Sequence, residues 1–189
     1  EEVLDYLYDL KGTGEDSYDV AGAAKVGSLF ETHFKLFQTA SEKCEGIKQI
    51  YDFCHESIGQ VVIHKNEVVP PNSVVMILDS WAHITNDGGF HDTHNHPNCS
   101  WCGIYCIEKG NSNQKTQNGI NRFHSPLNSS MVDAGNYYLQ AGAWDWEPSD
   151  GHLVVFPSYL MHSALPYSGD IDRIVISFNS TTVVQQEAI

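Results

Sequence analysis

The stretch LVVFPSYLMH, residues 153–162, is the part of the sequence that decides the fold. Its first four residues are apolar and mostly β-branched or aromatic, and Pro157 and Ser158 end the run. A short run of this kind, bounded by turn-forming residues, predicts a β-strand. His162 follows soon after, so we expect this histidine at the rim of a sheet.

Similar short runs recur along the chain, at residues 61–63, 74–78, 104–107 and 174–176. Segments rich in Gly, Pro, Asn and Asp bound them, and no helical pattern lies between them. Because parallel sheets need crossover helices between their strands, this spacing favours a β-sandwich or jelly roll over a parallel sheet.

The N-terminal third has a different pattern. Apolar residues recur at three- and four-residue spacing over residues 21–57, which predicts helices, and polar residues at 12–17 predict a mobile entry. A long polar stretch at about 109–147 predicts a lid or binding loop. We therefore expect one domain over residues 1–189, with a helical layer at 1–60 and a β core at 61–182.

The charge balance limits the partners. The chain has 24 acidic and 10 basic residues, a net charge of −14, and no cluster of Lys and Arg. Nucleic acids and anionic membranes attract basic patches, so we expect neither as a partner. No apolar run reaches the roughly 20 residues of a membrane helix. Five cysteines, an odd number, predict reduced thiols and a cytoplasmic location.

Histidines supply the main chemical signal. His94 and His96, two residues apart on an extended segment, point to the same side of the backbone. His162 can complete a three-histidine facial set with open positions, a pattern typical of non-heme Fe(II). The alternative is a hydrogen-bonded histidine cluster without a metal. Arg173, on a neighbouring predicted strand, is suited to bind a carboxylate with its planar guanidinium.

The surroundings of these residues leave several roles open. His91 is a candidate for orienting a ligand or contacting a substrate, and the Asp92 carboxylate is a weaker candidate ligand than His96. The Cys99, Cys102 and Cys106 run includes a single C-x-x-C, which is weak evidence for zinc, so we favour buried thiols. The tryptophans at positions 144 and 146 suit the substrate side and the core equally well.

Five ordered blocks resemble the Fe(II)/2-oxoglutarate-dependent oxygenase superfamily, and especially its small members with a His-x-His-Pro motif and a late Phe-Pro-Ser-x-x-x-His motif. The blocks read WAH at 81–83, HNHP at 94–97, CGIYC at 102–106, FPSYLMH at 156–162 and RIVISFN at 173–179. The resemblance covers residues 80 to 179, a little over half of the chain.

The resemblance implies a mainly β fold with N-terminal helices, a double-stranded β-helix of the jelly-roll, cupin-like kind. It implies Fe(II) on His94, His96 and His162, with 2-oxoglutarate anchored on Arg173. Ser177, further along the same strand face, and Tyr105, from the opposing strand, would add hydrogen bonds. The enzyme would then be a dioxygenase that uses molecular oxygen to hydroxylate or otherwise oxidise a small organic substrate, releasing succinate and CO2.

Two departures from the family pattern keep alternatives open. Most members of the superfamily have Asp or Glu where this chain has His96, and Trp-Ala-Asn becomes Trp81-Ala82-His83 here. Trp81, His83 and His91 would lie on the substrate side or behind the ligands. A three-histidine cupin-type dioxygenase without 2-oxoglutarate and a non-catalytic ligand-binding jelly roll are the alternative functions. Oligomeric state stays open, with a homodimer as one option.

Overall fold

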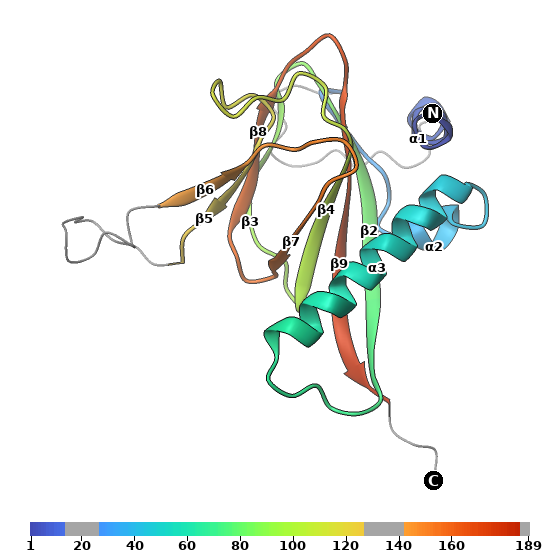
Figure 1. Ribbon diagram of the computed structural model, residues 1–189. Coiled ribbons are helices and arrows are strands. Elements are labelled where there is room, and N and C mark those ends of the chain that lie inside the picture. The colour runs from blue at the N-terminus through green and yellow to red at the C-terminus, as the bar shows by residue number, and fades with distance from the viewer. Residues whose placement is uncertain (14–26, 127–141, 186–189) are drawn as a thin grey trace, which may run out of the picture.

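Two antiparallel sheets face one another in the computed structural model, which describes residues 1–13, 27–126 and 142–185 (Figure 1). The larger sheet has the order β1 (Leu29–Glu31), β2 (Ser73–Thr85), β9 (Arg173–Val184), β4 (Trp101–Glu108) and β7 (Leu153–Pro157). The smaller sheet has the order β3 (Gly89–His94), β8 (His162–Tyr167), β5 (Asn121–His124) and β6 (Ala143–Trp146). From β2 onward the chain passes repeatedly between the two sheets, so the predicted jelly roll is confirmed.

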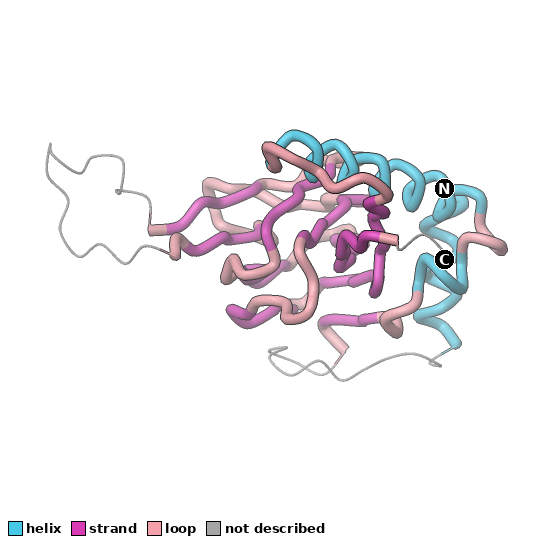
Figure 2. Tube along the Cα trace, turned by 90° about the horizontal axis from the view of Figure 1, so that it is seen from below, coloured by secondary structure: helices cyan, strands magenta, loops and turns pink. Residues whose placement is uncertain are grey.

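Helices cover the outer face of the larger sheet. They are α1 (Glu2–Thr13), α2 (Leu36–Ala40) and α3 (Glu45–Lys65), and α3 crosses the sheet in Figure 1. The buried residues of α3 are Ile47, Cys54, Ile58 and Val62, spaced as one face of a helix requires. They pack with apolar side chains of β9. Figure 2 shows the helices gathered along one side of the strands.

The alternation of side chains along β9 separates this helix-covered core from the interior between the sheets. Ile174 and Ile176 belong to the core under the helices, whereas Arg173, Val175 and Ser177 line the space between the sheets. Successive residues of a strand point to opposite faces, so one strand supplies both the packing and the polar groups of the interior.

An apolar cluster closes the space between the sheets. Cys102, Ile104, Phe156 and Val175 from the larger sheet pack with Phe123 from the smaller one. The rings of Phe123 and Phe156 meet edge to face, with their centroids 4.9 Å apart. This contact holds the two sheets together on one side of the interior.

A glycine permits the close approach of β4 and β9. A Cβ on Gly103 would overlap the ring of Phe178, which is fully buried. Because glycine has no Cβ, Gly103 leaves room for the end of the Phe178 ring against β4.

The structure corrects four local predictions. Residues 61–63 are helical, not a strand, because α3 continues past Gly59 to Lys65 and keeps Val62 on its buried face. Residues 29–31 form β1, not a helix, because they pair with the end of β2. Gly12 lies in α1, while residues 14–17 of the predicted mobile entry are outside the described residues. The predicted 109–147 loop contains β5 and β6; its remaining segment, 127–141, is outside the described residues.

The described residues include three helices, α1, α2 and α3. None combines the length and the apolar composition that crossing a bilayer demands.

Candidate metal centre and its cavity

A cavity of about 310 Å³ lies between the two sheets. One part of its wall is apolar and includes Phe34, Pro97, Ile104, Phe156 and Ala164. Most of the polar lining residues fall into three groups, which are His94, His96 and His162; Glu31, His83 and His91; and Asn121, Arg173 and Ser177; Asn95 and Asn179 also line the cavity. A concave site with an apolar wall and a few converging polar groups is typical of small-molecule binding.

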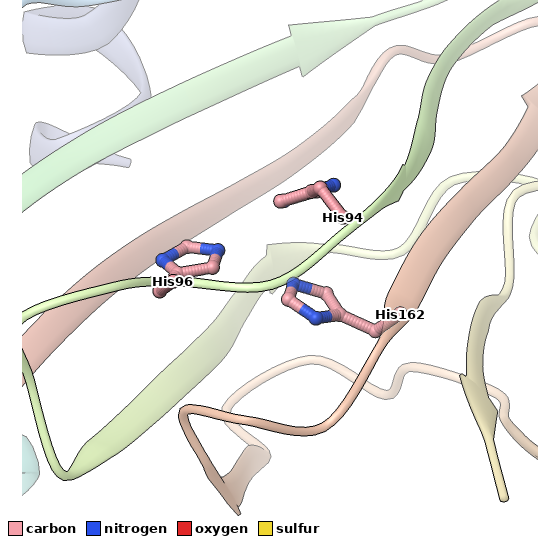
Figure 3. Close-up of side chains that lie close together, drawn as sticks. All are labelled: His94, His96 and His162. Atoms are coloured by element: carbon pink, nitrogen blue, oxygen red, sulfur yellow. The ribbon is translucent and has the colours of Figure 1, made fainter. Parts of the chain in front are cut away.

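The first group brings together the three histidines that the sequence predicts as ligands. His94 ends β3, His162 begins β8, and these two residues are register partners in the antiparallel pair. His96 lies two residues beyond β3. One ring nitrogen from each histidine lies within 4.8 Å of the others. Figure 3 shows the three side chains gathered beside the start of β8.

Hydrogen bonds fix the tautomer of each imidazole. In His94 and His162, Nδ1 lies 2.6 Å and 3.0 Å from the backbone carbonyl two residues earlier. In His96, Nδ1 lies 2.6 Å from Oδ1 of Asn179. These oxygens only accept, so each Nδ1 carries its hydrogen and each Nε2 keeps a lone pair. This is how metal-binding histidines are usually oriented.

Burial favours the neutral form of His96 and His162. Burial, with smaller contributions from the neighbouring histidines, lowers the pKa of His162 to about 3. Burial also lowers the pKa of His96 below its ordinary value. Nε2 of His96 is buried and has no hydrogen-bond partner among the described residues. A neutral imidazole with a buried, unsatisfied lone pair fits a metal ion.

Trp81 supports this group from β2. Its ring stacks on that of His96, with centroids 5.6 Å apart and an angle of 18° between the planes. Phe34 also meets the tryptophan ring edge to face, with centroids 5.1 Å apart. Trp81 therefore lines the cavity and holds the His96 ring from one side.

Arg173 lies at the start of β9 and is only 2% exposed. Its Nη2 donates to Oδ1 of Asn121 at 2.6 Å, while its Nε has no partner among the described residues. No carboxylate in the described part of the chain forms an ion pair with it. Burial lowers the pKa of Arg173 to about 10, and the guanidinium is still a cation at neutral pH. A buried, incompletely partnered guanidinium that lines a cavity fits a carboxylate ligand.

Glu31, His83 and His91 form a second group of donors in the same cavity. Nε2 of His83 lies 2.6 Å from Oε2 of Glu31, and Nε2 of His91 lies 3.8 Å from the same oxygen. Burial lowers the pKa of both histidines to about 3 and raises that of Glu31. Irregular register along β3 turns both His91 and His94 toward the cavity, with their ring centroids 5.3 Å apart.

Four residues named from the sequence lie away from the cavity lining. Tyr105 is a correction to the predicted co-substrate site, because its ring packs against Phe53 of α3, with centroids 6.0 Å apart. The Asp92 side chain is exposed, and its backbone carbonyl, not its carboxylate, contacts Nδ1 of His94. Trp144 is 55% exposed on β6, and Trp146 packs on the apolar cluster between the sheets.

The cysteines are free thiols. No group of described residues offers four cysteine or histidine ligands for structural zinc. Cys102 lines the cavity, and its thiol donates to Oδ1 of Asn179 at 3.3 Å. The sulfur of Cys99 lies 3.7 Å from that of Cys102. The amide oxygen of Asn179 therefore accepts from both Cys102 and His96.

Sequence reasoning did not assign roles to three residues of the site. Asn179 belongs to the RIVISFN block, and its even spacing from Arg173 places it on the cavity face of the strand, a signal that was available. Asn121 lies in the polar stretch predicted as a loop. Glu31 lies in the run predicted as helical, and nothing in its local sequence indicates a buried carboxylate.

Comparisons with known proteins agree with this geometry. No curated protein matches the sequence. Among solved structures, HygX from Streptomyces hygroscopicus, solved with nickel and 2-oxoglutarate bound, is 10% identical, with a TM-score of 0.56, over 95% of this chain and 78% of its own. A Pseudomonas putida prolyl-4-hydroxylase is 16% identical, with a TM-score of 0.54, over 94% and 83%. EvdMO1 is 15% identical, with a TM-score of 0.60, over 95% of this chain and 42% of its own.

At such identities these structures establish the fold alone, and this chain spans less than half of EvdMO1. The family assignment comes from a sequence model described as "Putative 2OG-Fe(II) oxygenase", which matches residues 79–179, just over half of the chain. The matched segment includes the three histidines and Arg173. The chain therefore belongs to the 2OG-Fe(II) oxygenases, enzymes that depend on Fe(II) and 2-oxoglutarate.

Proposed function

We propose that His94, His96 and His162 hold the Fe(II), and that Arg173 binds the distal carboxylate of 2-oxoglutarate in the same cavity. The observation that carries the proposal is the pairing of two incomplete sites in one cavity. Nε2 of His96 and Nε of Arg173 are both buried and without partners among the described residues. A metal ion would satisfy the first and a carboxylate the second.

The charges of the site support a dianionic co-substrate. Three neutral imidazoles leave both positive charges of Fe(II) in place, and Arg173 adds a third. Two carboxylates of 2-oxoglutarate would offset most of this charge inside a cavity where unpaired charges are costly. The absence of a ligand carboxylate among the three histidines therefore favours an anionic partner for the metal.

The residues of the chain act by binding and orientation. Arg173 would fix one end of the co-substrate with its planar guanidinium, and Ser177, on the same strand face and also lining the cavity, would donate a hydrogen bond. Asn179 keeps the lone pair of His96 directed away from β9 toward the other histidines. When bound, Fe(II) and 2-oxoglutarate supply the oxidative decarboxylation that yields succinate and CO2 and oxidises the substrate with O2.

The cavity suits a small organic substrate, which would be hydroxylated or otherwise oxidised. Its volume of about 310 Å³ has to hold the co-substrate as well. The apolar wall of Phe34, Pro97 and Phe156 would exclude water from the reacting centre. Trp81 and His91, which line the same cavity, would contact the substrate side.

Succinate release tests the proposal. Purified protein with Fe(II), ascorbate and O2 should release succinate only when 2-oxoglutarate is present, even without a substrate. The Arg173→Met variant should need far more 2-oxoglutarate for the same rate while its metal content stays unchanged. Arg122→Met is the matched control, since Arg122 pairs with Asp145 and does not line the cavity.

Two outcomes would contradict the assignment. Metal-loaded protein that oxidises a substrate without forming succinate would instead be a three-histidine dioxygenase of the cupin type. An Arg173→Met variant that loses its metal as severely as its co-substrate would show that Arg173 supports the metal site, not the carboxylate.

The cellular location and the oligomeric state are further parts of this proposal. The five free thiols support a reducing compartment such as the cytoplasm, which fractionation of cells with an antibody to the protein would test. A homodimer stays a prediction, and light scattering on the eluting protein would measure its mass.

A further inference from the structure

A carboxylate and two imidazoles outside the three-histidine group converge on one point of the cavity. Glu31 ends β1, His83 lies in β2, and these two residues are direct cross-strand partners. His91 approaches from β3 in the other sheet, because the irregular register of that strand turns it inward. One ligand atom from each residue lies within 4.8 Å of the other two.

The hydrogen bonds of the described residues do not complete this group. Nε2 of His83 uses one oxygen of Glu31, at 2.6 Å. Nε2 of His91 is buried, lies 3.8 Å from the same oxygen, and has no hydrogen-bond partner in the described part of the chain. Glu31 is 4% exposed, and no Lys or Arg of the described chain forms an ion pair with it. A buried carboxylate without a cation and a buried ring nitrogen without a partner are both costly.

We propose that Glu31, His83 and His91 form a second site for a divalent transition metal, beside the three-histidine centre. Two imidazole nitrogens and one carboxylate oxygen are the donor set of mononuclear zinc and non-heme iron sites that keep positions open for other ligands. A divalent ion would replace the proton between His83 and Glu31, give His91 a partner, and neutralise the buried carboxylate.

The two sites would share one cavity. His91 and His94 belong to different groups, yet their ring centroids are only 5.3 Å apart, and all six donor residues line the same space. The second site differs from the first in charge, because it contains a carboxylate and the three-histidine group does not. It would therefore retain a divalent ion without help from an anionic co-ligand.

Equilibrium dialysis against Co(II) under argon, without 2-oxoglutarate, tests the proposal. The wild-type protein should bind two equivalents. Glu31→Gln, which keeps the size of the side chain but removes its charge, should bind one, and His91→Gln should also bind one. His64→Gln is the matched control, because His64 is an exposed histidine at the end of α3, and it should still bind two.

His162→Gln separates the two sites, because it changes only the three-histidine group. It should keep the equivalent that Glu31→Gln loses, and the double variant should bind none. Circular dichroism and thermal unfolding identify the variants that fold, and His91→Gln, a half-buried position, provides the test if Glu31→Gln does not fold.

The result that overturns the second site is a single equivalent in the wild type that survives Glu31→Gln. Two equivalents in both the wild type and Glu31→Gln would also overturn it, since the second ion would then lie elsewhere. Failure of the three-histidine proposal looks different: one equivalent would be bound, lost in Glu31→Gln and retained in His162→Gln.

Discussion

Replacing Arg173 by methionine should make the ligand-free protein at least as stable as the wild type, although most substitutions at buried positions destabilise. Burial lowers the pKa of Arg173 from 12.5 to about 10. One pKa unit corresponds to 1.36 kcal/mol, so holding this cation in the fold costs about 3 kcal/mol. The methionine side chain fills much of the same volume without a charge.

The sign and the pH range of this cost follow from the direction of the pKa change. The folded protein holds the Arg173 proton less tightly than the unfolded chain does. The cost is therefore present in full at any pH below about 10, and it decreases as the pH rises above that value. A measurement at pH 7.5 includes all of it.

The loss of one hydrogen bond partly offsets this gain in stability. Nη2 of Arg173 donates to Oδ1 of Asn121, and the methionine variant leaves this amide without its partner, at a cost of about 1 kcal/mol or more. We therefore expect the free energy of unfolding of Arg173→Met to exceed that of the wild type by about 0 to 2 kcal/mol, using the pKa cost above. The control variant, Arg122→Met, removes the half-buried ion pair with Asp145 and should lose up to about 1 kcal/mol.

Urea unfolding of metal-loaded protein under argon, with and without 2-oxoglutarate, measures both halves of the prediction. At one hundred times its Kd, the co-substrate should add about 2.7 kcal/mol to the wild type and to Arg122→Met, and almost nothing to Arg173→Met. The reasoning is refuted if Arg173→Met loses more than about 2 kcal/mol without ligand. Equal stabilisation of Arg173→Met and wild type by 2-oxoglutarate would refute the carboxylate site.

Other predictions concern single side chains. Asn179→Ala should lower metal affinity by about 10- to 100-fold while the protein stays folded, because the His96 ring that Asn179 orients becomes free to turn. Co(II) titration measures this affinity, and an unchanged value would contradict the prediction. Gly103→Ala should cost about 1 to 3 kcal/mol in urea unfolding, because its Cβ would overlap an aromatic ring of β9. Gly59→Ala, a helical position with open space around it, should instead gain about 0.5 to 1 kcal/mol, and equal effects at both glycines would contradict the packing argument. The Arg122 guanidinium lowers the pKa of the Asp145 carboxyl, so the ion pair stabilises the fold above the unfolded pKa near 4 and this stabilisation is lost as the pH falls. Asp145→Asn should therefore cost up to about 1 kcal/mol at pH 7 and less at pH 3, which urea unfolding at the two pH values would measure.

Strands β2, β4, β7 and β9 of the larger sheet could be predicted because their apolar runs are short and bounded by turn residues, whereas β5 and β6 lie in the stretch that was predicted as a loop. The N-terminal part was harder for a physical reason. The apolar residues at 29–30 and 61–63 are too few to distinguish a period of 3.6 from a period of 2. The pairing of β1 with a strand more than 50 residues away, and the continuation of α3 beyond Gly59, decide these segments.

The residues of the candidate site also include some that could be located from the sequence and some that could not. His94, His96, His162 and Arg173 could be located because their spacing follows from strand geometry, and the structure brings them to one cavity; metal and co-substrate binding by these residues stay predictions. Glu31 could not be located, since its position opposite His83 depends on the register between β1 and β2. Tyr105 was misplaced because a match within a family block does not show which side of β4 a residue faces.

The position of Asn179 on β9 has a consequence for how the chain can change during evolution. Arg173 and Asn179 are six residues apart, about 20 Å along a strand, and both face the cavity. Inserting or deleting one residue between them would turn one of the two toward the helices. The separation can therefore change only in steps of two, and a homologue with an odd change in this interval should have lost either its co-substrate anchor or the support of its second histidine. The even difference in sequence position is what keeps both side chains on the cavity face of β9.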